Sequence, residues 1–302
     1  MPARDLPPQL HNVIRALAEH AAIEAVTLTG SRMTGFGTAE SDVDLFVYVR
    51  DTAALASVRN ELAGAQADKH ALVVIGQPGI PNNDIWMLRG AGVWVDLMWW
   101  TCEWAGKELD RRLVECAAEA GYTTSFWRSI RDGMPLFERT RWHRELQARA
   151  RSPYPEVLRT RITDLNGALL GSENPFSYLN QMRKALTEAD SVATQHRTAA
   201  WLASYFDVLF AGNRVLHPGE KRLVAFVERE CACRPERFSE DVDALVEGAA
   251  RARGDLIESA EGTLGRLRAS GLLFTNKGPV SPGRRPAVKN ERPSGFGAGA
   301  GP

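Results

Sequence analysis

The stretch of residues 26–49 constrains the fold of this chain more than any other. It begins as an apolar strand, turns at Gly30-Ser31, and continues through a Gly/Thr/Ser-rich connection into a second apolar strand that opens with Asp42 and Asp44. Successive side chains of a strand point to opposite faces, so the two aspartates share one face, with their Cα atoms about 6.6 Å apart. Carboxylates at the mouth of an apolar strand are costly unless a cation binds them. The pair therefore predicts a cation site.

The first third of the chain has the pattern of a small mixed sheet with helices. Apolar side chains at helical spacing predict helices over Leu6–Ala22 and Thr52–Ala65. Residues 78–83 are a predicted loop, and residues 89–92 form the turn of a predicted β-hairpin. The predicted strands are Val26–Thr29, Val43–Val49, Ala71–Ile75, Asp84–Leu88 and Val93–Trp100. This order predicts an α+β domain built on a mixed sheet over residues 1–105.

Beyond residue 105 the hydrophobic pattern becomes helical. The predicted helices are Glu108–Ala120, Ser125–Asp132, Arg139–Arg151, Tyr154–Leu170, Pro175–Thr194, Thr198–Gly212, Pro218–Glu230 and Glu240–Leu267. Pro175 and Pro218 suit the first turn of a helix. We expect an all-helical bundle over residues 106–275, with no strand longer than a few residues. Residues 276–302 contain six Gly and five Pro, and this composition predicts a disordered tail.

Charge and cysteine content narrow the classes of function only slightly. Lys plus Arg number 37, as do Asp plus Glu, so the net charge does not favour long nucleic acid or an anionic membrane. No apolar run approaches the roughly 18–20 residues of a membrane span. The four cysteines form no CxxC pair, and we interpret them as reduced thiols. These features predict a cytoplasmic protein that does not enter a membrane.

The motif around the aspartate pair resembles a known signature. Gly30-Ser31-Arg32, then Gly35, then Ser41-Asp42-Val43-Asp44-Leu45 resemble the signature of the DNA polymerase beta-like nucleotidyltransferase superfamily. In that signature, glycine and serine follow a strand, and Asp-x-Asp opens the next strand about a dozen residues later. The resemblance extends over residues 24–100. Within the superfamily, the chain looks most like small bacterial enzymes with a helical C-terminal domain, including the aminoglycoside nucleotidyltransferases.

The resemblance implies a nucleoside triphosphate substrate and two Mg²⁺ ions. A tight turn at Gly30 lets backbone N–H groups approach a triphosphate, and the Ser31 hydroxyl can donate to a phosphate oxygen. Arg32 and Ser41 are further candidates for nucleotide contacts. Asp42 and Asp44 would hold Mg²⁺, which usually binds one or two carboxylates together with substrate phosphates. The competing interpretation is an ordinary turn before a strand whose aspartates are solvated.

Asp96 is the candidate for a third carboxylate. It is the only acid in an apolar, aromatic strand, where an unpaired charge would cost several kcal/mol. The resemblance places such an aspartate on the strand beside the Asp-x-Asp strand, where it would share the metal or accept the proton of an acceptor hydroxyl. Three carboxylates this close repel one another without a cation, so the arrangement predicts metal dependence. The alternative is a surface aspartate on an edge strand.

Basic groups that hold phosphates are harder to assign from the sequence. Helical domains in these enzymes commonly lend a lysine to the triphosphate, which makes Lys184 and Lys221 candidates for nucleotide binding. The alternative for each is a solvated charge on a helix. His217 is interpreted as a helix-end histidine. Seven of the eight tryptophans lie between Trp86 and Trp142, and they are expected to be core residues more than platforms for a nucleobase.

The favoured hypothesis is an enzyme that moves a nucleoside monophosphate, most simply AMP from ATP, onto an acceptor hydroxyl with release of pyrophosphate. A small-molecule acceptor is favoured, and the balanced charge lowers the case for nucleic acid without removing it. One alternative is a minimal nucleotidyltransferase that modifies a protein or an RNA. Another is a non-catalytic module that binds a nucleotide or a partner protein. The helical half does not specify the acceptor.

Overall fold

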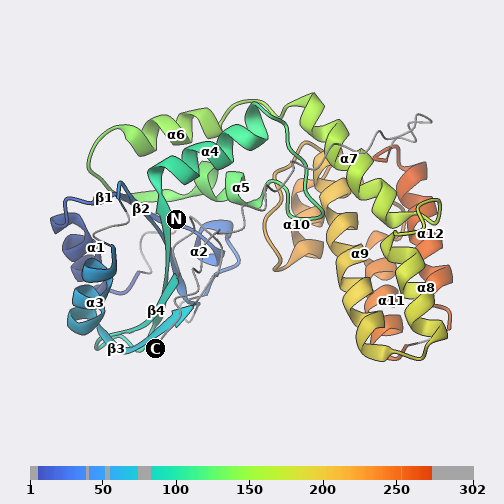
Figure 1. Ribbon diagram of the computed structural model, residues 1–302, viewed down its shortest axis with the longest axis horizontal. Helices are drawn as coiled ribbons and strands as arrows, with labels where there is room; N and C mark the ends of the chain where they lie inside the picture. Colours follow the sequence, from blue (N-terminus) through green and yellow to red (C-terminus); the bar gives the residue numbers. More distant parts are fainter. Residues whose placement is uncertain (1–5, 39–40, 52–54, 74–82, 253, 274–302) are drawn as a thin grey trace, which may run out of the picture.

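A six-stranded sheet with helices on both faces forms one end of the molecule, and a helical bundle forms the other (Figure 1). The structure is a computed structural model that describes residues 6–38, 41–51, 55–73, 83–252 and 254–273. The strands are β1 Ile23–Leu28, β2 Val43–Val49, β3 Ala67–Val73, β4 Asn83–Leu88, β5 Trp94–Thr101 and β6 Met134–Glu138, in the spatial order β3-β4-β5-β2-β1-β6. Only β2 and β5 pair in parallel, and the other neighbours are antiparallel. The predicted mixed sheet is therefore confirmed.

Each face of the sheet has its own hydrophobic core, as the alternation of side chains along a strand requires. Helices α1 (Leu10–Glu19) and α3 (Leu55–Gln66) cover one face, where Leu45 and Leu97 are buried. Helices α4 (Cys102–Leu113), α5 (Ser125–Asp132) and α6 (Trp142–Ala150) cover the other, where Phe46 and Tyr48 are buried. Figure 1 shows α4, α5 and α6 grouped together, away from α1 and α3. The short helix α2 (Ser31–Thr34) follows β1.

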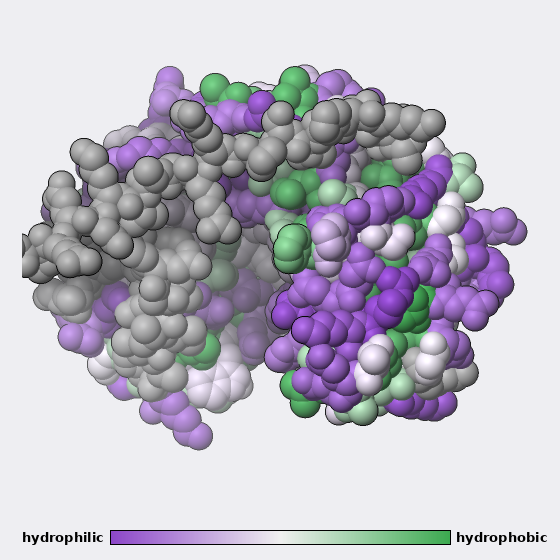
Figure 2. Space-filling view, turned by 45° about the vertical axis from the view of Figure 1, so that its right-hand side comes forward, coloured by the Kyte–Doolittle hydropathy of each residue, from purple (hydrophilic) through white to green (hydrophobic). Residues whose placement is uncertain are grey.

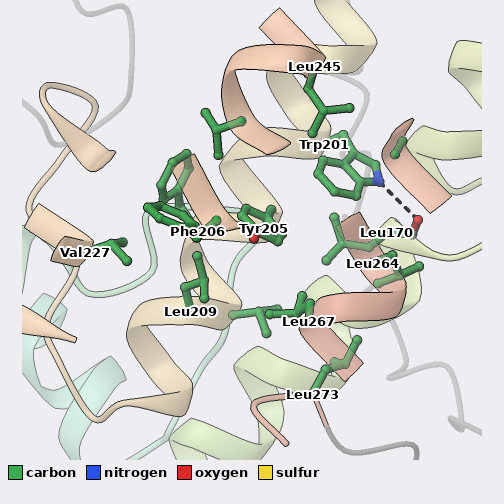
Figure 3. Packing of buried hydrophobic residues seen from close by; sticks show 14 of the residues in the cluster. Leu170, Trp201, Tyr205, Phe206, Leu209, Val227, Leu245, Leu264, Leu267 and Leu273 are labelled. Carbon is green, nitrogen blue, oxygen red and sulfur yellow. Dashed lines mark hydrogen bonds between the residues drawn. The ribbon is translucent and has the colours of Figure 1, made fainter. Parts of the chain in front are cut away.

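The bundle is built around the 22-residue helix α9 (Ser191–Gly212). Its other helices are α7 Glu156–Leu170, α8 Tyr178–Thr187, α10 Leu223–Glu230, α11 Phe238–Ala250 and α12 Leu256–Ala269. Trp201 and Tyr205 of α9 stack on each other inside the core, and the Trp201 Nε1 atom donates to the carbonyl of Leu170 at 3.1 Å (Figure 3). The predicted helical character of this half is confirmed.

Side chains that cap helices explain several differences between predicted and observed boundaries. Thr101 caps α4, since its hydroxyl accepts from Trp104 N at 3.0 Å, so this helix begins six residues before the predicted start at Glu108. Asp190 caps α9 in the same way and starts it at Ser191, within the predicted helix Pro175–Thr194. The predicted helices Pro175–Thr194 and Thr198–Gly212 are therefore replaced by the shorter α8 and the longer α9.

Three further expectations for the second half were wrong. Residues 134–138 form β6, which pairs with β1 at the edge of the sheet, although only helices were expected there. The edge position explains how Pro135, which has no N–H to donate, fits a strand. The predicted helix Glu240–Leu267 is two helices, α11 and α12. Pro175 and Pro218 precede α8 and α10 instead of occupying their first turns.

The exposed surface of the bundle is mostly polar, and the cysteines form no disulfides within the described part of the chain. Figure 2 shows mostly hydrophilic residues on the coloured face of the bundle, with apolar side chains in small separate groups, as is normal for a protein surface. All four cysteines are free. Among the helices within the described ranges, none is long and apolar enough to cross a membrane. The predicted loop residues 78–82 and the predicted disordered tail, 276–302, lie outside the described residues.

Candidate functional site

Asp44 and Asp96 lie side by side on the sheet. They are paired positions of the parallel strands β2 and β5, so their side chains leave the same face of the sheet. Asp42 is exposed and comes just before β2. The pKa of Asp96 is raised to about 6, first by burial and then by the charges of Asp44 and Asp42. The structure thus brings the three predicted acids close enough to repel one another.

The Gly-Ser turn lies directly against Asp44. Gly30 has a φ of 67°, and an ideal Cβ atom on it would lie 1.8 Å from Oδ2 of Asp44, so only glycine allows this approach. The backbone N–H of Ser31 donates to the Asp44 carboxylate. The backbone N–H of Thr29 donates to the Asp44 carbonyl at 2.8 Å. Burial nevertheless dominates, and the pKa of Asp44 is raised from its ordinary value.

Arg32 and Ser41 hold the main chain that leads into β2. The Arg32 Nε atom donates to the carbonyls of Ser41 at 3.1 Å and Asp42 at 3.2 Å, and its Nη2 atom donates to the Ser41 carbonyl at 2.5 Å. The Ser41 hydroxyl accepts from the N–H of Thr38 at 2.9 Å. These side chains therefore position Asp42 in this structure. Their predicted contacts with phosphates remain predictions.

The two candidate lysines have different surroundings. Lys221 is exposed in the segment between α9 and α10, and its positive charge acts to lower the pKa of both Asp44 and Asp96. Lys184 lies on α8, where its side chain is 74% exposed and pairs with Glu188 at 3.8 Å. Figure 1 shows α8 at the end of the bundle far from the sheet. The structure brings Lys221 to the carboxylates and leaves Lys184 away from them.

His217 is buried in the middle of the same segment and is not at a helix end. Its backbone N–H donates to Thr124 Oγ1 at 2.8 Å, and its Nδ1 atom accepts from the N–H of Gly219 at 3.1 Å. Burial, reinforced by the Arg128 guanidinium, lowers the pKa of His217 to about 3. An imidazole that accepts at Nδ1 and stays neutral carries its proton on Nε2. His217 therefore fixes the turn that precedes Lys221.

Most of the tryptophans in the sheet half pack inside the protein. Trp86 and Trp99 are fully buried, and Trp99 Nε1 donates to Asp84 Oδ2 at 2.7 Å. Trp100 stacks on Trp104 with ring centroids 4.6 Å apart, in the layer between the sheet and α4–α6. This packing favours the core interpretation over a platform for a nucleobase.

The sequence reasoning missed a contact between the Gly-Ser turn and the bundle. The Arg229 Nη1 atom on α10 donates to the carbonyl of Thr34 at 2.8 Å. Phe36 packs against Phe226 of the same helix with ring centroids 4.9 Å apart. The signal in the sequence is an aromatic residue between two glycines, Gly35 and Gly37, in a segment that was otherwise interpreted as a connection.

The donor set at the carboxylates suits a hard cation. Oδ1 of Asp96 is buried, and it has no hydrogen-bond partner in the described part of the chain. Oxygen ligands from aspartates are the ligands that Mg²⁺ takes from proteins, together with phosphates. As the side chains stand, however, no three His, Cys, Asp or Glu residues within the described ranges form a cluster that would hold a metal ion. A metal at these acids would therefore need further ligands, which substrate phosphates can supply.

Comparison with known proteins agrees with this geometry for the first part of the chain. Residues 10–75 match the family model described as a nucleotidyltransferase domain, and the match includes the Gly-Ser turn, Asp42 and Asp44. This part of the chain is therefore similar to nucleotidyltransferase domains. Asp96 and the whole bundle lie outside the matched residues.

Two solved structures are similar to most of the chain at low sequence identity. A nucleotidyltransferase-like protein from Exiguobacterium sibiricum 255-15 is 13% identical, with a TM-score of 0.40, over 87% of this chain and 76% of the other. A Thermotoga maritima CCA-adding enzyme complexed with tRNA is 11% identical, with a TM-score of 0.30, over 90% of this chain and 84% of the other. No curated protein matches the sequence.

Proposed function

We propose that the protein is a nucleotidyltransferase that moves a nucleoside monophosphate, AMP from ATP, onto an acceptor hydroxyl and releases pyrophosphate. One observation carries the proposal: Asp44 and Asp96 are paired on adjacent strands, and the Gly30-Ser31 turn lies against Asp44. The turn and Asp44 also lie within the residues that match a nucleotidyltransferase domain. We further propose that residues 1–105 carry the reaction at their carboxylates, with β6 and α4–α6 also packed on this sheet, and that the bundle supplies Lys221.

Asp42, Asp44 and Asp96 would hold two Mg²⁺ ions. The support is the raised pKa of Asp44 and Asp96, together with Oδ1 of Asp96, which has no hydrogen-bond partner among the described residues, since acids in this state gain most from a bound cation. Bound Mg²⁺ supplies positive charge that stabilises the attacking oxygen and the departing pyrophosphate.

The chain's own groups have distinct parts in the proposed reaction. The acceptor oxygen attacks the α-phosphorus in line, the bond from that phosphorus to the bridging oxygen of the β-phosphate breaks, and pyrophosphate leaves. Asp96 would either complete the metal site with Asp42 and Asp44 or accept the proton of the acceptor hydroxyl. Gly30, Ser31 and Ser41 would position the phosphates. Lys221 would bind them from the bundle.

The acceptor in this proposal is a small molecule. Equal numbers of basic and acidic residues support a small acceptor over a long nucleic acid. Four free cysteines suit a reducing compartment, and we place the reaction in the cytoplasm.

The test is incubation of the purified protein with Mg²⁺, each of four labelled nucleoside triphosphates and a panel of hydroxyl acceptors, with pyrophosphate release as the readout. We expect release with ATP and at least one small acceptor, and none from Asp44→Asn. Asp243→Asn, which changes an exposed aspartate on α11, is the matched control and should react like wild type. Release that is equal in wild type and Asp44→Asn would contradict the proposal.

A further inference from the structure

The backbone on both sides of Phe36 favours glycine, through a positive φ at Gly35 and close packing at Gly37. Gly35 has a φ of 80° and ends α2. An ideal Cβ atom on Gly37 would lie 2.9 Å from the Cα atom and 3.0 Å from the N atom of Arg32. The N–H of Gly37 donates to the carbonyl of Ser31 at 3.0 Å and closes the loop. The two glycines thus allow the compact turn that carries the side chain of Phe36.

Phe36 packs against the bundle and not against its own sheet. It lies against the hydrophobic core of the bundle, with its ring edge-on to Phe226 at a centroid distance of 4.9 Å. The guanidinium carbons of Arg229 and Arg222 lie 4.5 and 5.3 Å from the centroid of the Phe36 ring. Cations at this distance from an aromatic ring are attracted by its quadrupole. The Phe36 ring therefore joins the segment after the Gly-Ser turn to α10, beside the hydrogen bond from Arg229 to the Thr34 carbonyl.

Helix α10 is fixed from a second direction as well. Its last residue, Glu230, accepts hydrogen bonds from both terminal nitrogens of Arg128 on α5, each at 2.8 Å. Arg229 Nη2 donates to the same carboxylate at 2.7 Å, while its Nη1 donates to the carbonyl of Thr34. Residues 221 and 222 lead directly into this helix. The place of Lys221 relative to Asp44 therefore depends on how α10 is held.

We propose that Phe36 is a positioning residue for nucleotide binding. It holds the Gly-Ser turn against α10, so that Lys221 and the aspartates can bind the same triphosphate. The inference rests on the proposed function, because it assigns Phe36 to the triphosphate site of that reaction. A loss of alignment between two groups that bind one ligand lowers affinity even when neither group is changed.

The test is a double-mutant cycle on MgATP binding, measured by calorimetry on the full chain. We expect Phe36→Ala and Lys221→Met each to weaken binding about tenfold, which corresponds to about 1.4 kcal/mol. The double variant should be no weaker than Lys221→Met alone, because the placement of an absent lysine does not matter. Phe36→Trp, which keeps an aromatic face for both guanidinium groups, should retain binding.

Two controls separate positioning from a general loss of structure. Tyr178→Ala removes a half-buried ring that packs on the same core from α8, and it should leave MgATP affinity unchanged. Thermal unfolding shows whether each variant is folded, and Phe36→Leu replaces Phe36→Ala in the cycle if the alanine variant is not.

The outcomes are distinguishable. If wild type binds MgATP and Lys221→Met weakens it, while the folded Phe36 variant binds like wild type, the inference is overturned and the proposed function stands. Losses that add in the double variant also overturn the inference, since Phe36 would then act separately from Lys221. If wild type binds no nucleoside triphosphate, the proposed function itself fails.

Discussion

Asp44 and Asp96 face the same side of the sheet from paired positions on two parallel strands, one strand spacing of about 4.8 Å apart. This relationship makes the pair costly on its own, because burial and the charge of its neighbour raise the pKa of Asp96 to about 6. It also makes the pair useful, because two carboxylates at this spacing can share a cation.

Asp96→Asn should stabilise the metal-free protein at high pH. A folded-state pKa above the ordinary value means that the native state loses its proton later than the unfolded chain, so wild type loses stability as the pH rises from about 4 to about 6. The partial exposure of Asp96 screens the effect, and we expect a gain of about 1 kcal/mol at pH 8 and almost none at pH 4. Urea unfolding at both pH values measures the difference. An equal change in the free energy of unfolding at both pH values would contradict the predicted pH dependence.

Gly30→Ala should damage both stability and nucleotide binding. The new methyl group would overlap the Asp44 carboxylate, in addition to the strain of a side chain at positive φ. Gly90→Ala is the matched control, because Gly90 has a similar φ of 69° with nothing within 4 Å of its Cβ position. We expect the Gly30 variant to lose at least about 2 kcal/mol more stability than the Gly90 variant. Equal losses by chemical denaturation would show that the contact is unimportant.

Lys221→Met should weaken MgATP binding, and Lys184→Met should not. Lys221 acts electrostatically on Asp44 and Asp96, whereas Lys184 is exposed and pairs with Glu188. The two substitutions remove the same charge, so their comparison controls for net charge. Calorimetric titration at two salt concentrations checks the result, since the Lys221 contribution should shrink as salt rises. A larger loss of MgATP affinity in Lys184→Met than in Lys221→Met would contradict the assignment of Lys221 to nucleotide binding.

His217→Asn should flatten the acid end of the stability curve. The pKa of His217 in the native state is lowered to about 3, so below pH 6.5 the unfolded chain binds a proton that the native state does not bind. The free energy of unfolding therefore falls as the pH drops from about 6.5 to 3. At pH 5 this costs wild type about 2 kcal/mol. The neutral asparagine variant should lack that loss, whereas the exposed control His11→Asn should keep it. Parallel curves for the His217 variant and wild type would contradict the burial argument.

The sequence predicted the central part of the site because its signals are local. The apolar run Val43–Val49 predicted β2, and Asp96 stood out as the lone acid of an aromatic strand, while its place beside β2 was implied by the family resemblance. The mixed sheet and the helical second half follow from the same periodicities. The roles of the site residues remain proposals, as does the boundary near residue 105.

The rest depends on contacts between residues far apart in the chain. Strand β6 forms because Met134–Glu138 pairs with β1, and no pattern within these residues indicates that pairing. His217 lies in a coil segment that is buried by contacts with α5 and α9. These contacts are not visible in the local sequence, which was interpreted as a helix end. Phe36 packs on a helix almost two hundred positions later, at Phe226. Side chains that act across such distances are visible only once the fold is known.

The most direct test of the account is calorimetric titration of ATP, with and without Mg²⁺, into wild type and into Asp42→Asn and Asp44→Asn variants. We predict that wild type binds ATP only with Mg²⁺ and that each variant loses at least about tenfold in affinity. Equal, Mg²⁺-independent binding by all three proteins would contradict the assignment of Asp42 and Asp44 as the groups that hold the metal and the nucleotide.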